Sequence, residues 1–288
     1  MTDPNHPHAD ALKYEDWAGE MGARWLANLD GFERTIAPVG EALLARAAFA
    51  PGDRVIDLGC GGAATTLAIA RMVAPHGFAL GLDISPDLIA AATRRAEQAD
   101  VGNAGFLCAD AAKASVSDAP YDRLFSRFGS MFFAEPVPAF ANLRAMLKPG
   151  GRIDLAVWGP PPRNPWMTDG MAVARQHVEM PAPVPRAPGP LAFEERDYLR
   201  EGLGGAGFSE VAIDELAGEL PVGGAGASAG QACAFARNAM AFGQVLLDYP
   251  EAVQQAAARD LTALYQRHYR PGEGVMMNYC VWLVTARG

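Results

Sequence analysis

Residues Val55 to Ala63, with the sequence VIDLGCGGA, predict a buried strand that ends in a tight glycine-rich turn. Glycine lets the backbone turn sharply and lets a ligand lie against bare main chain. The apolar segment 64–73 follows as a predicted helix, whose N-terminus offers unpaired N–H groups and a positive end. A strand, a glycine turn and a helix in this order indicate a site for a nucleotide-like cofactor.

Strands and helices alternate on the C-terminal side of this turn. Further strands are predicted at 78–84, 105–109, 121–126 and 152–158, with helices at 85–99 and 138–147 between them. Ser85 is a helix N-cap, and Pro86 suits the first helical position. Alternation of this kind predicts a parallel sheet with helices on both faces. Ligands bind such sheets at the carboxyl ends of the strands, so the residues just after each strand are the candidates for chemistry.

Segments of different character flank this core. Residues 1–50 read as an N-terminal helical lid segment, in which Tyr14, Trp17 and Trp25 are spaced for one helix face. Residues 51–158 are the predicted cofactor-binding core. Residues 159–288 are predicted to hold cap insertions, with helices at 231–247 and 251–269, and the last two strands, at 208–216 and 275–285. The predicted fold is α/β, a Rossmann-like seven-stranded mostly parallel sheet with helices on both faces, an N-terminal helical leader and helical cap insertions.

Composition argues against several classes of function. The chain of 288 residues has 24 Lys and Arg against 33 Asp and Glu, a net charge of −9, and no basic cluster. Nucleic-acid binding needs such a cluster, so a small-molecule substrate is favoured. No apolar run reaches the length of a membrane span, and the polar start lacks a secretory core, so we expect a cytoplasmic protein. The four cysteines form no C-x-x-C pair, which predicts reduced thiols and no metal site. A homodimer is possible.

Two cofactor classes are compatible with the glycine turn. Gly59-x-Gly61-x-x-Ala64 fits the dinucleotide fingerprint, and Asp83, 24 residues after Gly59, could hold a ribose hydroxyl. Asp57 favours the other class, because a carboxylate suits the ammonium and sulfonium of S-adenosylmethionine better than a pyrophosphate. Asp110, after the third strand, could accept from an adenine amino group. An NAD(P)-dependent oxidoreductase and a non-catalytic cofactor-binding domain remain the alternatives.

Four motifs in order carry a resemblance to a known family. They are 57-DLGCG-61, Asp83-Ile84, Ala109-Asp110-Ala111 and 147-LKPGG-151, each at the end or the start of a predicted strand. Over about residues 40–158 the chain resembles the class I S-adenosylmethionine-dependent methyltransferases. The segment 126-SRFGSMFF-133 and the Trp17/Trp25 leader resemble the ubiquinone/menaquinone-methyltransferase branch of that family.

The resemblance implies binding roles at the methionine end of the cofactor. Gly59 and Gly61 would line the methionine and the ribose, with Asp57 near the amino group. Ser126 and Arg127, after the fourth strand, would lie near the methionine end.

It also implies roles at the nucleoside end. Asp83 would accept from both ribose hydroxyls, and Ile84 would pack on the adenine face. Asp110 and the Ala111 N–H would contact the adenine edge. Trp25 would belong to a lid over the cofactor.

The chemistry implied is methyl transfer to a small molecule, at carbon, oxygen or nitrogen. Its main requirement is alignment of acceptor, methyl and sulfur, with a base only where the acceptor must lose a proton. The Asn/Asp-Pro-Pro-Tyr motif of amino methyltransferases is absent after the fourth strand. Candidate catalytic residues are Arg127, which could pair with a carboxylate of substrate or cofactor, and His177, His268 and Tyr269 as bases.

The acceptor itself is less well defined by the sequence. The residues after the fifth strand include Trp158, Trp166, Met167 and Met171, which could line an apolar pocket or belong to the core. With the insert at 159–200, they favour a partly apolar acceptor such as a quinone, a phenol or a polyketide.

Overall fold

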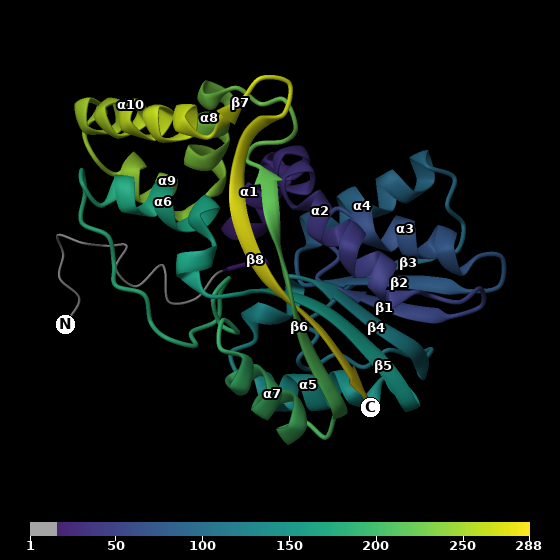
Figure 1. The fold of residues 1–288 in the computed structure, drawn as a ribbon. Helices are drawn as coiled ribbons and strands as arrows, with labels where there is room; N and C mark the ends of the chain where they lie inside the picture. Colours follow the sequence, from purple (N-terminus) through teal and green to yellow (C-terminus); the bar gives the residue numbers. More distant parts are fainter. Residues whose placement is uncertain (1–15) are drawn as a thin grey trace.

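A mixed β-sheet forms the centre of the computed structural model, which describes residues 16–288 (Figure 1). Its strands are β1 (Arg54–Leu58), β2 (Phe78–Asp83), β3 (Ala104–Cys108), β4 (Tyr121–Arg127), β5 (Leu147–Trp158), β6 (Ser209–Pro221), β7 (Tyr269–Arg270) and β8 (Gly274–Arg287). The order is β3-β2-β1-β4-β5-β8-β6. The first five strands are parallel, and β8 is antiparallel to both of its neighbours. The predicted seven-stranded, mostly parallel sheet is confirmed along this path, and the unpredicted two-residue β7 pairs with β8 beside it.

Helices cover both faces of the sheet, as expected for a parallel sheet with buried strands. The helices of the described residues are α1 (Glu20–Ala27), α2 (Leu29–Ala47), α3 (Ala64–Val73), α4 (Pro86–Gln98), α5 (Pro136–Ala145), α6 (Pro165–Ala174), α7 (Arg196–Gly205), α8 (Ala229–Ala239), α9 (Ala241–Leu247) and α10 (Glu251–Arg267), with short 3₁₀ turns at Gly129–Phe132 and Pro161–Arg163. Figure 1 shows α2, α3 and α4 on one face and α5 and α7 on the other. None of the helices within residues 16–288 is long and apolar enough to cross a membrane.

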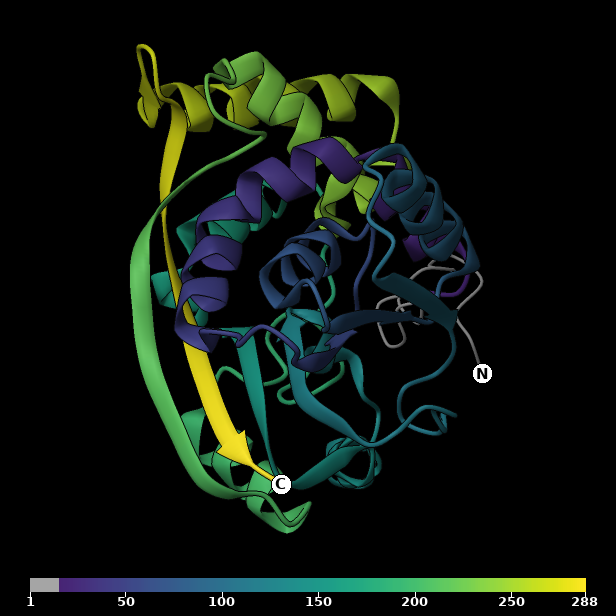
Figure 2. The same cartoon turned by 90° about the vertical axis from the view of Figure 1, so that its right-hand side faces the viewer.

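A long antiparallel pair of strands carries the cap, which we define as helices α6, α8, α9 and α10. Strand β8 pairs with β5 only from Val281 onward, while its first half continues to pair with β6. Because β5 and β8 run in opposite directions, this first half extends beyond the carboxyl end of β5. The cap helices α8 to α10 lie between β6 and β8 in the chain, so they are held above the carboxyl edge of the sheet (Figures 1 and 2).

Several predicted boundaries were wrong. In the described part of the N-terminal segment, which was read as helical to residue 50, α2 runs from Leu29 to Ala47 in spite of Pro38, and residues 48–50 lie outside any helix. The helix expected at 231–247 is broken at Met240, whose backbone is extended. At this break Gly243 approaches the chain so closely that a Cβ would come within 3 Å of the Arg237 backbone. The sixth strand continues to Pro221, because its pairing with β8 continues to that residue. Tyr14 lies outside the described residues.

Candidate active site

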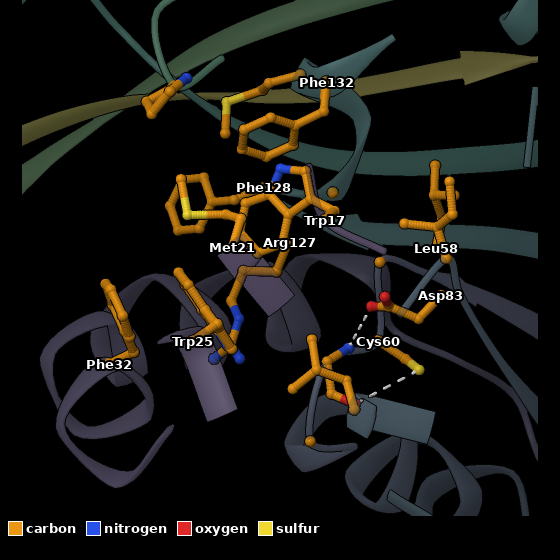
Figure 3. A pocket seen from close by; sticks show the side chains of 18 of the residues that line it. Trp17, Met21, Trp25, Phe32, Leu58, Cys60, Asp83, Arg127, Phe128 and Phe132 are labelled. Carbon is orange, nitrogen blue, oxygen red and sulfur yellow. Dashed lines mark hydrogen bonds between the residues drawn. The ribbon is translucent and has the colours of Figure 1, made fainter. Parts of the chain in front are cut away.

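A pocket of about 380 Å³ opens at the carboxyl edge of the sheet. This is within the range of volumes for small-molecule sites. The ends of β1, β2, β4 and β5 form its floor, and α1, α2 and the cap supply its walls. Figure 3 shows aromatic rings on one side of it and the glycine turn with Asp83 on the other.

The glycine turn after β1 presents bare backbone to the pocket. Gly59 and Gly61 both line it, with φ of 67° and 52°, in the left-handed region that favours glycine. A Cβ on Gly59 would come within 2.6 Å of the Gly129 Cα, so the turn is held against the loop after β4. A Cβ on Gly61 would have the Trp25 Nε1 at 3.6 Å as its nearest neighbour, which leaves room for a ligand beside that residue.

Asp83 ends β2 beside this turn and lines the pocket. Its Oδ2 accepts from the Gly61 N–H and its Oδ1 from the Ser85 N–H, each at 2.9 Å. Burial raises the pKa of this carboxyl, against the effect of these backbone donors. The neighbouring Ile84 is an apolar side chain left 41% exposed at the same pocket. An acceptor group and an exposed apolar surface therefore lie side by side, as a ribose and an adenine require.

Asp110 and Ala111 line the pocket after β3. The Oδ1 of Asp110 accepts from the Ala112 N–H at 3.0 Å, which fixes the carboxylate at the start of the turn. The Lys113 Nζ lies 3.4 Å from its Oδ2. The structure thus brings the ends of β1, β2 and β3 together around one pocket.

Asp57 differs from the prediction, because it does not line the pocket. It is 1% exposed, and its Oδ2 accepts from the hydroxyls of Thr65 at 2.8 Å and Thr66 at 2.6 Å. Burial raises the pKa of Asp57 to about 6, even though these hydroxyls lower it. Its Oδ1 has no hydrogen-bond partner. These hydrogen bonds therefore join the end of β1 to the first turn of α3. They hold the glycine turn in place from the side away from the pocket.

Ser126 also lies away from the pocket surface. It is fully buried, and its hydroxyl donates to the Leu58 carbonyl at 2.9 Å, because β4 runs beside β1. The next residue, Arg127, does line the pocket. Of the two residues at the end of β4 that we expected to contact a ligand, only Arg127 lines the pocket.

An aromatic cluster from the N-terminal helices covers one side of the pocket. Trp25 stacks on Phe32 with ring centroids 3.8 Å apart, and the edge of Trp17 meets Trp25 at 5.6 Å. Trp17 also contacts Phe132, after β4, at 4.8 Å. Trp17, Trp25 and Phe132 all line the pocket, so these helices are placed as its cover (Figure 3).

An ion pair that the sequence analysis missed fastens this cover. Both guanidinium nitrogens of Arg95, on α4, donate to the Glu33 carboxylate of α2, at 2.7 and 2.8 Å. Arg95 also donates to the Gly62 carbonyl at 2.6 Å. One side chain thus joins α2, α4 and the glycine turn. Residues so far apart along the chain give no local pattern that could have predicted this.

A second aromatic wall lies toward the cap. Phe128 and Trp158 stack with centroids 4.0 Å apart and planes 8° apart, and Trp166 on α6 follows at 4.9 Å from Trp158. All three line the pocket, as does Met167, whereas Met171 packs only against the core. Trp166 is 4% exposed, and its Nε1 has no hydrogen-bond partner.

The predicted bases are not at the pocket. The Nε2 of His177 lies 2.8 Å from Asp260 Oδ2, between the segment after α6 and α10. His268 and Tyr269 follow α10 at the far end of the cap, where the backbone of His268 pairs with Met276. None of the three lines the pocket, since the cap turns them away from it.

The comparisons with known proteins agree with this arrangement. Residues 55–151 match the model of a methyltransferase domain. A nocamycin O-methyltransferase of Saccharothrix syringae is 26% identical over 264 residues, which is 87% of this chain and 90% of that protein. A demethylmenaquinone methyltransferase of Thermus thermophilus is 33% identical over 111 residues, 38% of this chain and 50% of that one. The chain spans only about half of the length of this and of another curated relative that it matches.

A solved structure shares the fold. Phosphoethanolamine N-methyltransferase 2 of Haemonchus contortus, in complex with S-adenosyl-L-methionine, superposes with a TM-score of 0.52 at 13% identity, over 87% of this chain and 52% of that one. The matched segment begins in β1 and ends in β5, so it contains the glycine turn, Asp83 and Asp110. Residues 55–151 therefore match a methyltransferase domain, and the chain shares the fold of this solved methyltransferase structure.

Proposed function

We propose that the chain binds S-adenosylmethionine along the carboxyl ends of β1, β2 and β3 and methylates a small, partly apolar molecule that lies against the cap. The observation that carries this proposal is the continuity of the pocket. Gly61, Asp83 and Asp110 line it at one end, and Trp158 and Trp166 line it at the other. A methyl donor and an apolar acceptor could therefore meet in one cavity that the N-terminal helices cover.

The residues at the first end fit the cofactor. The Gly59 and Gly61 backbone leaves space for it, and Asp83 keeps lone pairs for ribose hydroxyls beyond its two backbone donors. Ile84 offers an apolar face, and Asp110 is placed to accept from an amino group. The cofactor supplies a methyl group activated by its sulfonium, while these residues hold and orient it.

The residues at the second end support an aromatic, oxygen-bearing acceptor. The Phe128/Trp158 stack offers a flat apolar surface. Trp166 lines the same end of the pocket and extends this aromatic surface. Cap residues line this end of the pocket, and we expect the protein to act on the acceptor mainly by positioning it. A quinone, phenol or polyketide has this chemistry. The related demethylmenaquinone methyltransferase supports placing the chain near the ubiquinone/menaquinone branch, and the related nocamycin O-methyltransferase supports methylation at oxygen.

Calorimetric titration tests the cofactor. S-adenosylhomocysteine should bind the wild-type chain, and Asp83→Asn should weaken binding about tenfold or more through loss of a charge-assisted acceptor. Asp87→Asn, which changes an exposed carboxyl on the next helix, is the matched control and should bind normally. Binding of NADH in place of S-adenosylhomocysteine would refute the proposal, and an Asp110→Ala variant with full cofactor affinity would count against the adenine contact.

A further inference from the structure

Three consecutive residues at the break between α8 and α9 line the pocket. They are Ala239, Met240 and Ala241, and we call them the cap wall. The backbone of Met240 is extended between the two helices, so α8 ends before it and α9 begins after it. Two of the three side chains are single methyl groups, whereas a methionine is long, unbranched and able to adapt to the shape of a ligand. The cap wall is therefore apolar and contains one adaptable side chain.

Close packing on both sides fixes the position of the cap wall. The Gly243 N–H donates to the Met240 carbonyl at 3.0 Å. A Cβ on Gly243 would come within 3 Å of the Arg237 backbone, so the first turn of α9 lies directly against the end of α8. Toward the N-terminal helices, the ring of Phe235 on α8 lies 5.2 Å from that of Phe32 on α2, measured between centroids. The cap wall is therefore held in place by its own helices and by α2.

A contact between α6 and α9 places the cap wall beside the aromatic end of the pocket. A Cβ on Gly170 of α6 would come within 2.9 Å of the Phe242 ring, so the two helices touch at these residues. Phe242 directly follows the cap wall in the chain. Trp166 and Met167 precede Gly170 by four and three positions, so they lie on the same face of α6, one turn away. Both also line the pocket. The cap wall therefore adjoins the end of the pocket at which we place the acceptor.

We propose that Met240, with Ala239 and Ala241 beside it, determines how large an aromatic acceptor the pocket takes. This inference rests on the proposed function. The Phe128/Trp158 stack supports the face of an aromatic ring, but a flat surface does not limit how far a fused ring system extends along it. A wall beside that surface sets this limit. The side chains of the cap wall are apolar, so it selects acceptors by size and shape and not by hydrogen bonding.

Two quinones that differ by one fused ring test the proposal. Binding of 1,4-naphthoquinone and of 1,4-anthraquinone would be measured by quenching of tryptophan fluorescence, with S-adenosylhomocysteine present. Met240→Ala shortens the longest side chain of the cap wall, so it should raise the affinity for the three-ring quinone relative to the two-ring quinone about tenfold. Ala241→Phe lengthens the cap wall into the pocket and should lower the same affinity ratio about tenfold or more.

A variant on the same helix serves as the matched control. Leu247 ends α9, is 57% exposed and does not line the pocket. Leu247→Ala also shortens an apolar side chain of the cap, and it should keep the wild-type affinity ratio for the two quinones. Calorimetric titration of each variant with S-adenosylhomocysteine reports whether the cofactor end is still folded, so that a changed ratio is not the result of unfolding.

The outcomes separate this inference from the proposed function. If Met240→Ala and Ala241→Phe bind S-adenosylhomocysteine and keep the wild-type ratio for the two quinones, the cap wall does not select acceptors and the methyltransferase proposal stands. If Ala241→Phe no longer binds S-adenosylhomocysteine, Met240→Ala decides alone. If the wild type binds S-adenosylhomocysteine but neither quinone, the aromatic acceptor of the proposed function is wrong, and this inference falls with it.

Discussion

Replacing Asp57 with Asn should remove a pH-dependent loss of stability. Asp57 is fully enclosed, and burial raises its pKa from 3.8 to about 6. The ionised carboxylate is therefore disfavoured in the folded chain. A change of this size corresponds to about 3 kcal/mol of native-state stability lost when the group is ionised at about pH 8.

The sign of the pH dependence follows from the direction of this shift. A raised pKa means that the folded state binds more protons than the unfolded state between about pH 3.8 and 6. The contribution of Asp57 to stability therefore improves as the pH falls through 6. Linkage gives about 1.4 kcal/mol regained between about pH 8 and pH 5, roughly half of the total.

Urea unfolding of the wild type and of Asp57→Asn at these two pH values measures the effect. All other titrating groups are shared, so the difference between the two proteins isolates Asp57. The wild type should gain about 1.4 kcal/mol relative to the variant on going from about pH 8 to pH 5. Asp87→Asn, at an exposed position, should follow the wild type. Parallel pH profiles of the wild type and Asp57→Asn would refute the reasoning, because they would mean that Asp57 does not titrate in this window.

Three further predictions concern the pocket. Gly61→Ala places an alanine in the left-handed region at a cost of about 1–2 kcal/mol, so this variant should fold with a slightly lower melting temperature and lose S-adenosylhomocysteine binding in calorimetry. Gly59→Ala also meets the Gly129 backbone and should fold poorly. Normal cofactor affinity in Gly61→Ala would contradict the proposal that the cofactor lies against this glycine. Trp158→Ala removes one ring of the Phe128/Trp158 stack, so in steady-state assays with an identified aromatic acceptor it should lower kcat/KM about tenfold while cofactor affinity stays the same. An unchanged kcat/KM would exclude this stack as the acceptor surface. His177→Ala should leave turnover unchanged, because His177 contacts Asp260 and does not line the pocket. A large loss of turnover would show that His177 takes part in the reaction.

The sequence by itself determined the end of the pocket that β1, β2 and β3 form. The apolar run before Gly59, the glycines of the turn, and Asp83 and Asp110 after later strands are local signals, because strand burial and a positive φ constrain residue type position by position. The carboxyl ends of parallel strands must share one edge, so the order of these motifs was sufficient to bring them to one pocket.

Only the tertiary structure decided how the side chains face one another. Asp57 and Ser126 lie near the ends of strands, where we expected ligand contacts. Both are buried instead, because their side chains hydrogen-bond to the first turn of α3 and to the neighbouring strand β1, respectively. The Glu33–Arg95 pair depends on a contact between segments that are far apart in the chain. The spacing of apolar residues predicts single helices and strands, but it does not predict which side chains meet when those elements pack together.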